Sequence, residues 1–137
     1  MPKLHDPALY TEAADGLALA GQRCRDCGKV AFPRKRVCPE CFGENLDGQN
    51  LSRTGVLHTF TRTHTGAPHL AKPYVIGLVD VPEGIRLLSL IEDYEPYEEV
   101  LRAGLELEMF IAPLMTGADG EVLHGYKFRP AGIKRSG

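Results

Sequence analysis

Hydrophobic and polar residues alternate along the second half of the chain with the two-residue period of β-strands. We expect strands at residues 55–63, 73–81, 85–93, 105–114 and 121–130. The turn residues Pro82, Glu83 and Gly84 predict that the second and third of these strands pair as a hairpin. Gly77 suggests a bend or a bulge within the second strand. Five strands with one short helical or turn segment, at 95–103, suit a small closed or partly open barrel, and the OB-fold is the commonest five-stranded form.

The first fifty residues lack this alternation and carry helix and turn residues instead. Asp6 and Pro7 are typical of a helix N-cap followed by the first helical position. We therefore predict a short helix over residues 7–14, with Gly16 as its stop. The polar, turn-rich stretch 43–50 is interpreted as the junction to a second module.

Four cysteines form two C-x2-C pairs that are separated by ten residues. They are Cys24, Cys27, Cys38 and Cys41. Two such pairs can bring four thiolates tetrahedrally onto one ion. Gly28 follows the first pair, where the turn commonly requires a positive φ. Two disulfides are the alternative, which a reducing cytosol disfavours. The spacing predicts a zinc ribbon whose metal is structural, because four thiolates leave no open coordination position; iron is not distinguished from zinc by spacing.

These patterns describe a mainly β chain in four segments. They are an N-terminal helix with its lead-in (1–22), a zinc ribbon (23–50), a five-stranded OB-fold barrel (51–130) and a tail (131–137).

The charge of the chain is small overall but unevenly distributed. The 137 residues include 16 basic and 18 acidic side chains, for a net charge of −2. Residues 1–53 carry 8 basic and 7 acidic side chains (net +1), whereas residues 54–137 carry 8 and 11 (net −3). A negative barrel argues against a barrel wrapped around nucleic acid. No apolar run reaches the about 20 residues needed to span a bilayer, and the N-terminus lacks the apolar core of a signal peptide. The cytoplasm is therefore the expected compartment.

The predicted ribbon is rich in cations. Between positions 23 and 36, Asp26 is the one acidic residue, against Arg23, Arg25, Lys29, Arg34, Lys35 and Arg36. Such a cluster is either a solvated face or a surface that recognises an anion, such as the phosphates of a nucleic acid or of a cofactor tail.

Histidines are the candidates for catalysis, since the predicted metal site uses every cysteine. His58 and His124 fall within predicted strands, where a structural role is favoured. His64 and His69 lie in the long connection 63–73, a kind of segment in which binding residues concentrate. No carboxylate partner lies near either of them in sequence, so docking on a ligand or a partner explains this loop equally well. With no G-x-S-x-G, P-loop or G-x-G-x-x-G motif in the sequence, we assign no catalytic residue.

Several motifs together resemble a known family. They are CGKVAFPR (27–34), CPEC (38–41), GVLHTFT (55–61), KPYVIGLVDV (72–81), EGIRLLSLI (83–91), GLELEM (104–109) and a closing F-x-P (128–130). In this order they resemble the rubredoxin-like zinc-ribbon/OB-fold, acyl-CoA-associated family that was long catalogued as a domain of unknown function. The resemblance covers nearly the whole chain, and CPEC together with P-Y-x-x-G-L-V-D is fairly specific to the family.

The resemblance implies a non-catalytic accessory subunit. Members of the family assemble with thiolases, thiolase-like aldolases, hydroxymethylglutaryl-CoA synthases or enoyl-CoA hydratases, and this chain is similar to the small subunits of thiolases such as benzoylsuccinyl-CoA thiolase. The chain would hold Zn²⁺ and help bind or channel a coenzyme A thioester, while the partner supplies the catalytic residues. The six ribbon cations, with His64, His69 and Lys72 of the long connection, are the candidates for contacting acyl-CoA or the partner. The alternatives are an OB-fold/zinc-ribbon nucleic-acid-binding module and a stand-alone enzyme that uses His64 or His69.

Overall fold

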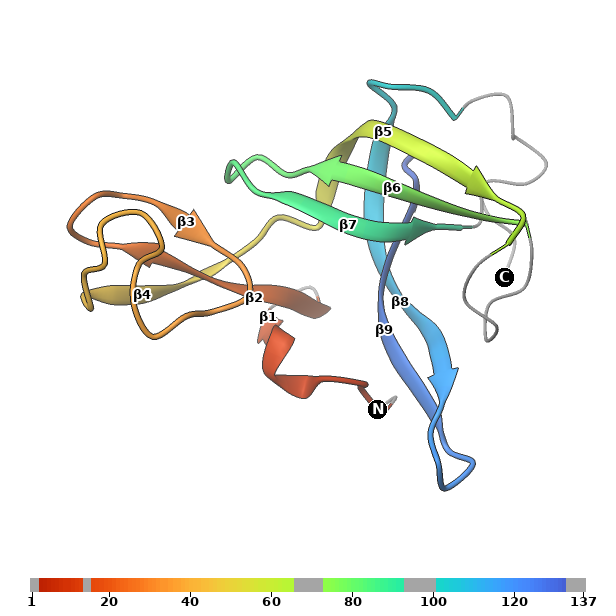
Figure 1. Ribbon diagram of the computed structural model, residues 1–137, viewed down its shortest axis with the longest axis horizontal. Coiled ribbons are helices and arrows are strands. Elements are labelled where there is room, and N and C mark those ends of the chain that lie inside the picture. The colour runs from red at the N-terminus through yellow and green to blue at the C-terminus, as the bar shows by residue number, and fades with distance from the viewer. Residues whose placement is uncertain (1–2, 14–15, 66–72, 93–100, 133–137) are drawn as a thin grey trace. The chain divides into compact units, whose positions relative to one another are not determined.

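The computed structural model describes the chain in four stretches, 3–13, 16–65, 73–92 and 101–132. It divides into two compact units, each drawn as a ribbon in Figure 1. The ribbon unit comprises Asp6–Arg53 and Val81–Ile85, and the barrel unit comprises Met1–His5, Thr54–Asp80 and Arg86–Gly137. Across the described stretches, no helix is long and apolar enough to cross a membrane.

The ribbon unit is built around one central strand. Its strands are β1 (Tyr10–Ala13), β2 (Gly16–Cys24), β3 (Val30–Ala31) and β4 (Leu46–Asn50). Strand β2 pairs antiparallel with each of the other three, with β1 along its first half and with β3 and β4 along its second. The buried side chains of β2, which include Leu19 and Cys24, form the core of this unit together with Val30 and Leu51. Strand β2 therefore links the apolar core to the first cysteine pair.

The predicted N-terminal helix is wrong beyond its first turn. Asp6 is the N-cap as expected, since its carboxylate accepts a hydrogen bond from the Ala8 N–H at 3.3 Å. The turn that follows is a single 3-10 turn, Pro7–Leu9, and the chain then continues as β1. A helix of eight residues has little stability by itself, whereas β1 gains a full antiparallel ladder against β2. Thr11 also donates a hydrogen bond from Oγ1 to Asn50 Oδ1 at 2.7 Å.

The polar stretch 43–50 is likewise not a simple junction, because most of it is strand β4 of the ribbon sheet. Residues Leu46–Asn50 pair with Cys24–Ala20 of β2. Only Leu46 and Gln49 of this strand are half-buried, and the other three positions are exposed. The polar composition therefore reflects a strand with little buried surface.

The barrel unit contains the five predicted strands, which are confirmed. They are β5 (Thr54–Thr63), β6 (Tyr74–Asp80), β7 (Arg86–Ile91), β8 (Glu106–Thr116) and β9 (Val122–Pro130). They close into a barrel in the order β5-β6-β7-β9-β8, in which β7 and β9 are parallel and all other neighbours are antiparallel. The long β8–β9 hairpin extends beyond the other strands of the barrel (Figure 1). The predicted segment 95–103 lies mostly outside the described residues.

Gly77 has a packing role and is not the site of a bulge. A Cβ at this position would lie 3.0 Å from Leu57 Cδ1, 3.1 Å from the Thr59 carbonyl oxygen and 3.2 Å from Ile91 Cγ1. The ladder between β5 and β6 is irregular on the opposite strand, where its register shifts between Leu57 and Thr59. A glycine at position 77 therefore lets these neighbours close over the barrel core.

Candidate metal centre and ribbon surface

The two cysteine pairs lie in two turns with the same backbone hydrogen bonds. In the first turn the Cys24 N–H donates to the Lys29 carbonyl at 2.9 Å, and the Gly28 N–H donates to the Cys24 carbonyl at 2.8 Å. In the second turn the Cys38 N–H donates to the Gly43 carbonyl at 2.8 Å, and the Phe42 N–H donates to the Cys38 carbonyl at 2.9 Å. These repeated turns aim both pairs of thiols at one point.

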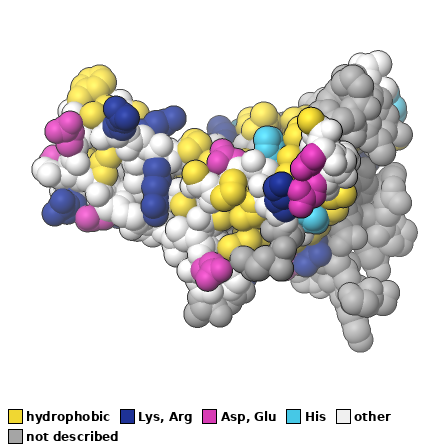
Figure 2. Space-filling view, turned by 90° about the horizontal axis from the view of Figure 1, so that it is seen from below, with side chains coloured by type: hydrophobic (Ala, Val, Ile, Leu, Met, Phe, Trp, Pro, Cys, Tyr) yellow, Lys and Arg dark blue, Asp and Glu magenta, His cyan; other side chains and the backbone are white. Residues whose placement is uncertain are grey.

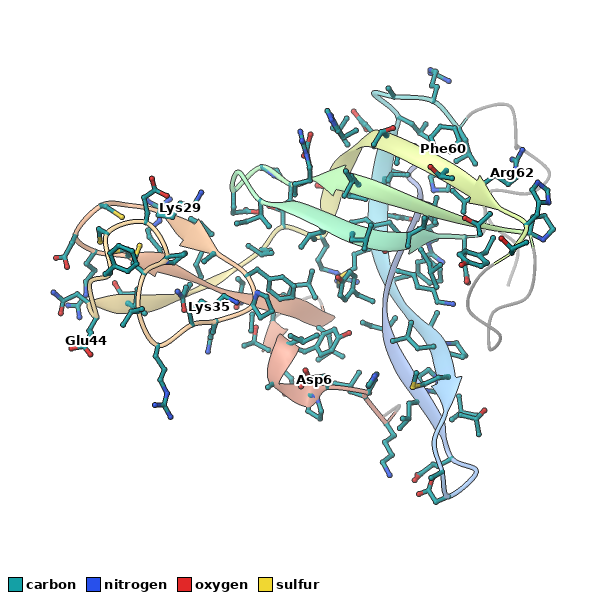
Figure 3. All side chains as sticks on the ribbon, in the orientation of Figure 1. Asp6, Lys29, Lys35, Glu44, Phe60 and Arg62 are labelled. Carbon is teal, nitrogen blue, oxygen red and sulfur yellow. The ribbon has the colours of Figure 1, made fainter. Side chains whose placement is uncertain are left out.

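The four sulfur atoms form a cluster of the size that one metal ion requires. All four lie within 4.8 Å of one another, and the yellow sulfur atoms gather near Lys29 in Figure 3. The Sγ atoms of Cys24 and Cys41 are 3.6 Å apart, and those of Cys27 and Cys38 are 3.5 Å apart. A tetrahedral site with Zn–S bonds of about 2.3 Å separates its sulfurs by about 3.8 Å. The geometry thus fits a single ion, and the cysteines are free thiols rather than two disulfides.

The pKa values of the clustered thiols also favour binding of a cation. Donation from the Cys41 N–H lowers the pKa of Cys38 from its ordinary value of 9.0 to about 7. The Gly43 N–H lowers the pKa of Cys41, but the Cys24 sulfur and burial outweigh it and raise that pKa to about 12. Four neighbouring thiols therefore cannot all ionise by themselves, and a bound cation supplies the charge that permits it.

The six predicted cations of the ribbon are all exposed. Figure 2 shows Lys and Arg side chains spread over the ribbon unit, at the left of the view. Arg25 lies 3.4 Å from Asp47, and Arg34 donates from Nε to the Gly21 carbonyl at 2.9 Å. Of the six, Arg34 and Lys35 come together at one cleft, which Gln22 also lines. Gln22 was not among the predicted site residues, since nothing in the spacing of residues distinguishes it from other polar strand residues.

Comparison with known proteins relates both units to one family. The model for the ChsH2 rubredoxin-like zinc ribbon domain matches residues 11–47, and the model for the ChsH2 C-terminal OB-fold domain matches residues 48–111. A benzoylsuccinyl-CoA thiolase subunit, BbsA, of Thauera aromatica is 35% identical over 125 residues, which cover 90% of this chain and 85% of the relative. The chain belongs to the ChsH2-like DUF35 family. The resemblance that the sequence motifs indicated is thereby confirmed.

Other DUF35 relatives extend this picture. A DUF35 domain-containing scaffold protein of Methanocaldococcus jannaschii is 34% identical over 116 residues, which cover 82% of this chain and 81% of the relative. Among solved structures, the Ltp2-ChsH2(DUF35) aldolase matches with a TM-score of 0.66 and 27% identity, covering 83% of this chain and 85% of that one. The relatives therefore include a thiolase subunit, a scaffold protein and a component of an aldolase.

Phe42 is an unusual residue of this DUF35 chain that the sequence analysis did not single out. It occupies in the second turn the position that Gly28 occupies in the first, and both have positive φ, 61° for Phe42 and 80° for Gly28. The Phe42 side chain is also 75% exposed, so burial does not offset the strain of its backbone. The repeated turn was the feature that could have revealed it, because a positive φ after the first pair implies the same after the second.

Replacing Phe42 with glycine is expected to stabilise the ribbon unit by about 1–2 kcal/mol, because glycine adopts this conformation without a Cβ clash. The free energy of unfolding of the ribbon unit, measured by urea denaturation of the metal-loaded protein, tests this. Phe42→Ala is the matched control, since alanine removes the ring but keeps the strain. Equal stability of the glycine and alanine variants would show that the positive φ at position 42 carries no backbone strain.

The predicted histidine loop is only partly described in this DUF35 chain. His64 follows β5 directly and is exposed, whereas His69 and Lys72 lie outside the described residues. The two strand histidines lie in β5 and β9, and their surroundings differ. His58 is exposed with its Nδ1 3.7 Å from Asp80 Oδ2, and the buried Nδ1 of His124 has no hydrogen-bond partner. Neither arrangement identifies a general base.

Proposed function

We propose that this DUF35 chain is a non-catalytic accessory subunit of a thiolase or of a thiolase-like aldolase or synthase. The observation that carries the proposal is 35% identity to a thiolase subunit over 90% of the chain. The match to the Ltp2-ChsH2(DUF35) aldolase supports the same class of partner. In this role the chain helps to bind or channel a coenzyme A thioester while a carbon–carbon bond is formed or cleaved on the partner.

The metal in this proposal is one structural Zn²⁺ held by Cys24, Cys27, Cys38 and Cys41. The spacing of the four sulfur atoms and the match to the ChsH2 zinc ribbon domain family support this ligand set. Four thiolates fill a tetrahedral shell, so the ion stabilises the ribbon and does not meet substrate. Metal analysis of the purified protein distinguishes zinc from iron.

The same four cysteines also indicate which subunit carries the catalytic nucleophile. They are the only cysteines in the sequence, and their four sulfur atoms lie within 4.8 Å of one another. A thiolase-type reaction uses a nucleophilic cysteine, and a thiolate bound to a structural metal cannot serve as one. The nucleophile must therefore belong to the partner subunit.

The surfaces that this chain offers to acyl-CoA or to the partner are cationic. The exposed ribbon residues Arg23, Arg25, Lys29, Arg34, Lys35 and Arg36 suit either coenzyme A phosphates or an acidic patch of the partner. The loop that contains His64, His69 and Lys72 is the second candidate surface. The net charge of −3 on residues 54–137 disfavours the alternative of an OB-fold that binds nucleic acid.

Affinity purification of the tagged chain from the cells that produce it tests this proposal. We expect it to recover, in fixed stoichiometry, a subunit that has a thiolase-like active site and turns over acyl-CoA. Recovery of the chain alone would contradict an accessory role. Recovery of single-stranded nucleic acid, lost as the salt concentration rises, would instead support the nucleic-acid-binding alternative.

A further inference from the structure

A small cleft in the ribbon unit combines a buried donor with two cations. Its volume is about 190 Å³, and we call it the ribbon cleft. It is lined by Gln22, Arg34, Lys35, Leu46, Asp47 and Gly48. All six residues belong to the ribbon unit, and Lys35, labelled in Figure 3, follows the first cysteine turn in sequence.

Gln22 places an unpaired donor in this cleft. Its side chain is 97% buried, since only 3% is exposed, and its Nε2 has no hydrogen-bond partner. The orientation of the amide is fixed because Oε1 accepts a hydrogen bond from the Lys35 N–H at 2.7 Å. Nε2 is therefore the free atom, and a buried N–H without an acceptor is rare in folded proteins.

Arg34 is held over the same cleft. Its Nε donates to the Gly21 carbonyl at 2.9 Å, which fixes the guanidinium against the sheet. A Cβ at Gly48 would come within 2.9 Å of Arg34 Nη2, so a glycine at this position of β4 leaves room for the guanidinium. Asp47 is the one acidic residue among those that line the cleft, and its carboxylate lies 3.4 Å from the guanidinium of Arg25. The cleft thus has donors in excess over acceptors.

We propose that the ribbon cleft is a phosphate-binding site in which Gln22 Nε2, Arg34 and Lys35 donate hydrogen bonds to one phosphate group. A phosphate has enough acceptor oxygens for three convergent donors, and its dianion matches two cations better than a single carboxylate does. The buried Gln22 amide is a donor in a fixed orientation, which a diffuse cluster of surface cations does not provide. The site rests on the proposed function in one respect, since Arg34 and Lys35 are among the cations offered there to coenzyme A phosphates. Its test with inorganic phosphate needs neither a partner nor an acyl-CoA, so the two proposals can fail separately.

Titration of the full-length, metal-loaded chain with inorganic phosphate, followed by ¹H–¹⁵N NMR at constant ionic strength, tests the site. We expect saturable shifts at the Gln22 side-chain amide and at the backbone amides of Lys35 and Gly48. Gln22→Glu is the informative variant, because a carboxylate of the same shape still accepts the Lys35 N–H but replaces the donor with negative charge. Binding of phosphate by this variant is expected to be at least about tenfold weaker, the scale of one charge-assisted hydrogen bond.

Gln49→Glu is the matched control, since it makes the same substitution and the same change of charge on the neighbouring strand β4 outside the cleft. Phosphate affinity within about twofold of the unchanged protein is expected for it, as for a charge change screened by solvent. Equal weakening by the two variants would show diffuse attraction and overturn the site. An acetate titration that shifts the same amides with equal or higher affinity would overturn the assignment to phosphate.

Discussion

Replacing Cys38 with alanine is expected to release the metal and to unfold the ribbon unit while the barrel unit stays folded. Cys38 is 1% exposed, and its N–H and carbonyl both take part in the second cysteine turn. The binding free energy of a structural zinc site is about 10–16 kcal/mol, and folding of such a site depends on it. Loss of one ligand of four therefore removes most of the stability of this unit. The barrel has its own buried core, which includes Leu57, Leu107 and Phe128.

Metal content by mass spectrometry and the ¹H–¹⁵N spectrum of the variant measure these two effects separately. We expect well below one equivalent of metal per chain. The amide chemical shifts of the ribbon unit are expected to lose their dispersion, while the resonances of the barrel unit keep their positions. Val37→Ala is the matched control, because Val37 precedes Cys38 and is exposed. A Cys38→Ala protein that keeps one equivalent of zinc would show that the cysteine cluster is not the metal site.

Phe128→Ala is expected to destabilise the barrel unit by about 3–5 kcal/mol, the cost of emptying a buried phenylalanine site. Among the described residues, Phe128 is the largest fully buried side chain, and it packs edge-to-face on Tyr126 with ring centroids 6.4 Å apart. It also lies where the barrel closes, since it pairs with Ile91 of β7 and with Met109 of β8. Domains of this size are stable by only about 5–15 kcal/mol, so the loss is a large fraction of the total.

Urea denaturation followed by far-ultraviolet circular dichroism measures this loss. Leu88→Ala serves as the control within the same barrel, because Leu88 is 60% exposed and its truncation is expected to change stability by less than about 0.5 kcal/mol. If the two variants unfolded at the same urea concentration, Phe128 would not be a core residue of the barrel.

The barrel and the cysteine cluster were the parts of this structure that the sequence predicted well. Strands such as β6 bury every second residue, so alternation marks them without knowledge of their neighbours. The spacing of the cysteines is equally local, because each pair needs only one short turn. Both features depend on residues that are close together in the sequence.

Features that depend on distant partners were not predictable in this way. Strand β1 forms because β2 offers a ladder, although the sequence around Asp6 and Pro7 begins as a helix would. Gly77 suggested a bend or a bulge, whereas the structure shows the close approach of Leu57 and Ile91 from other strands. The free amide of Gln22 became visible only once the Lys35 N–H was known to occupy its oxygen.

The accessory role is tested most directly by reconstituting acyl-CoA turnover from separately purified subunits. The rates to compare are those of the co-purifying partner alone, of this chain alone and of the two combined. A chain with alanine at both His64 and His69 provides the control for catalysis by the loop. We predict no turnover by this chain alone and full turnover only for the combination. With the double-alanine chain, kcat at saturating acyl-CoA and saturating chain is expected to stay the same, and any loss is expected in KM or in subunit affinity. Turnover by this chain alone, or partner activity that is unchanged when this chain is withheld, would contradict the proposed function.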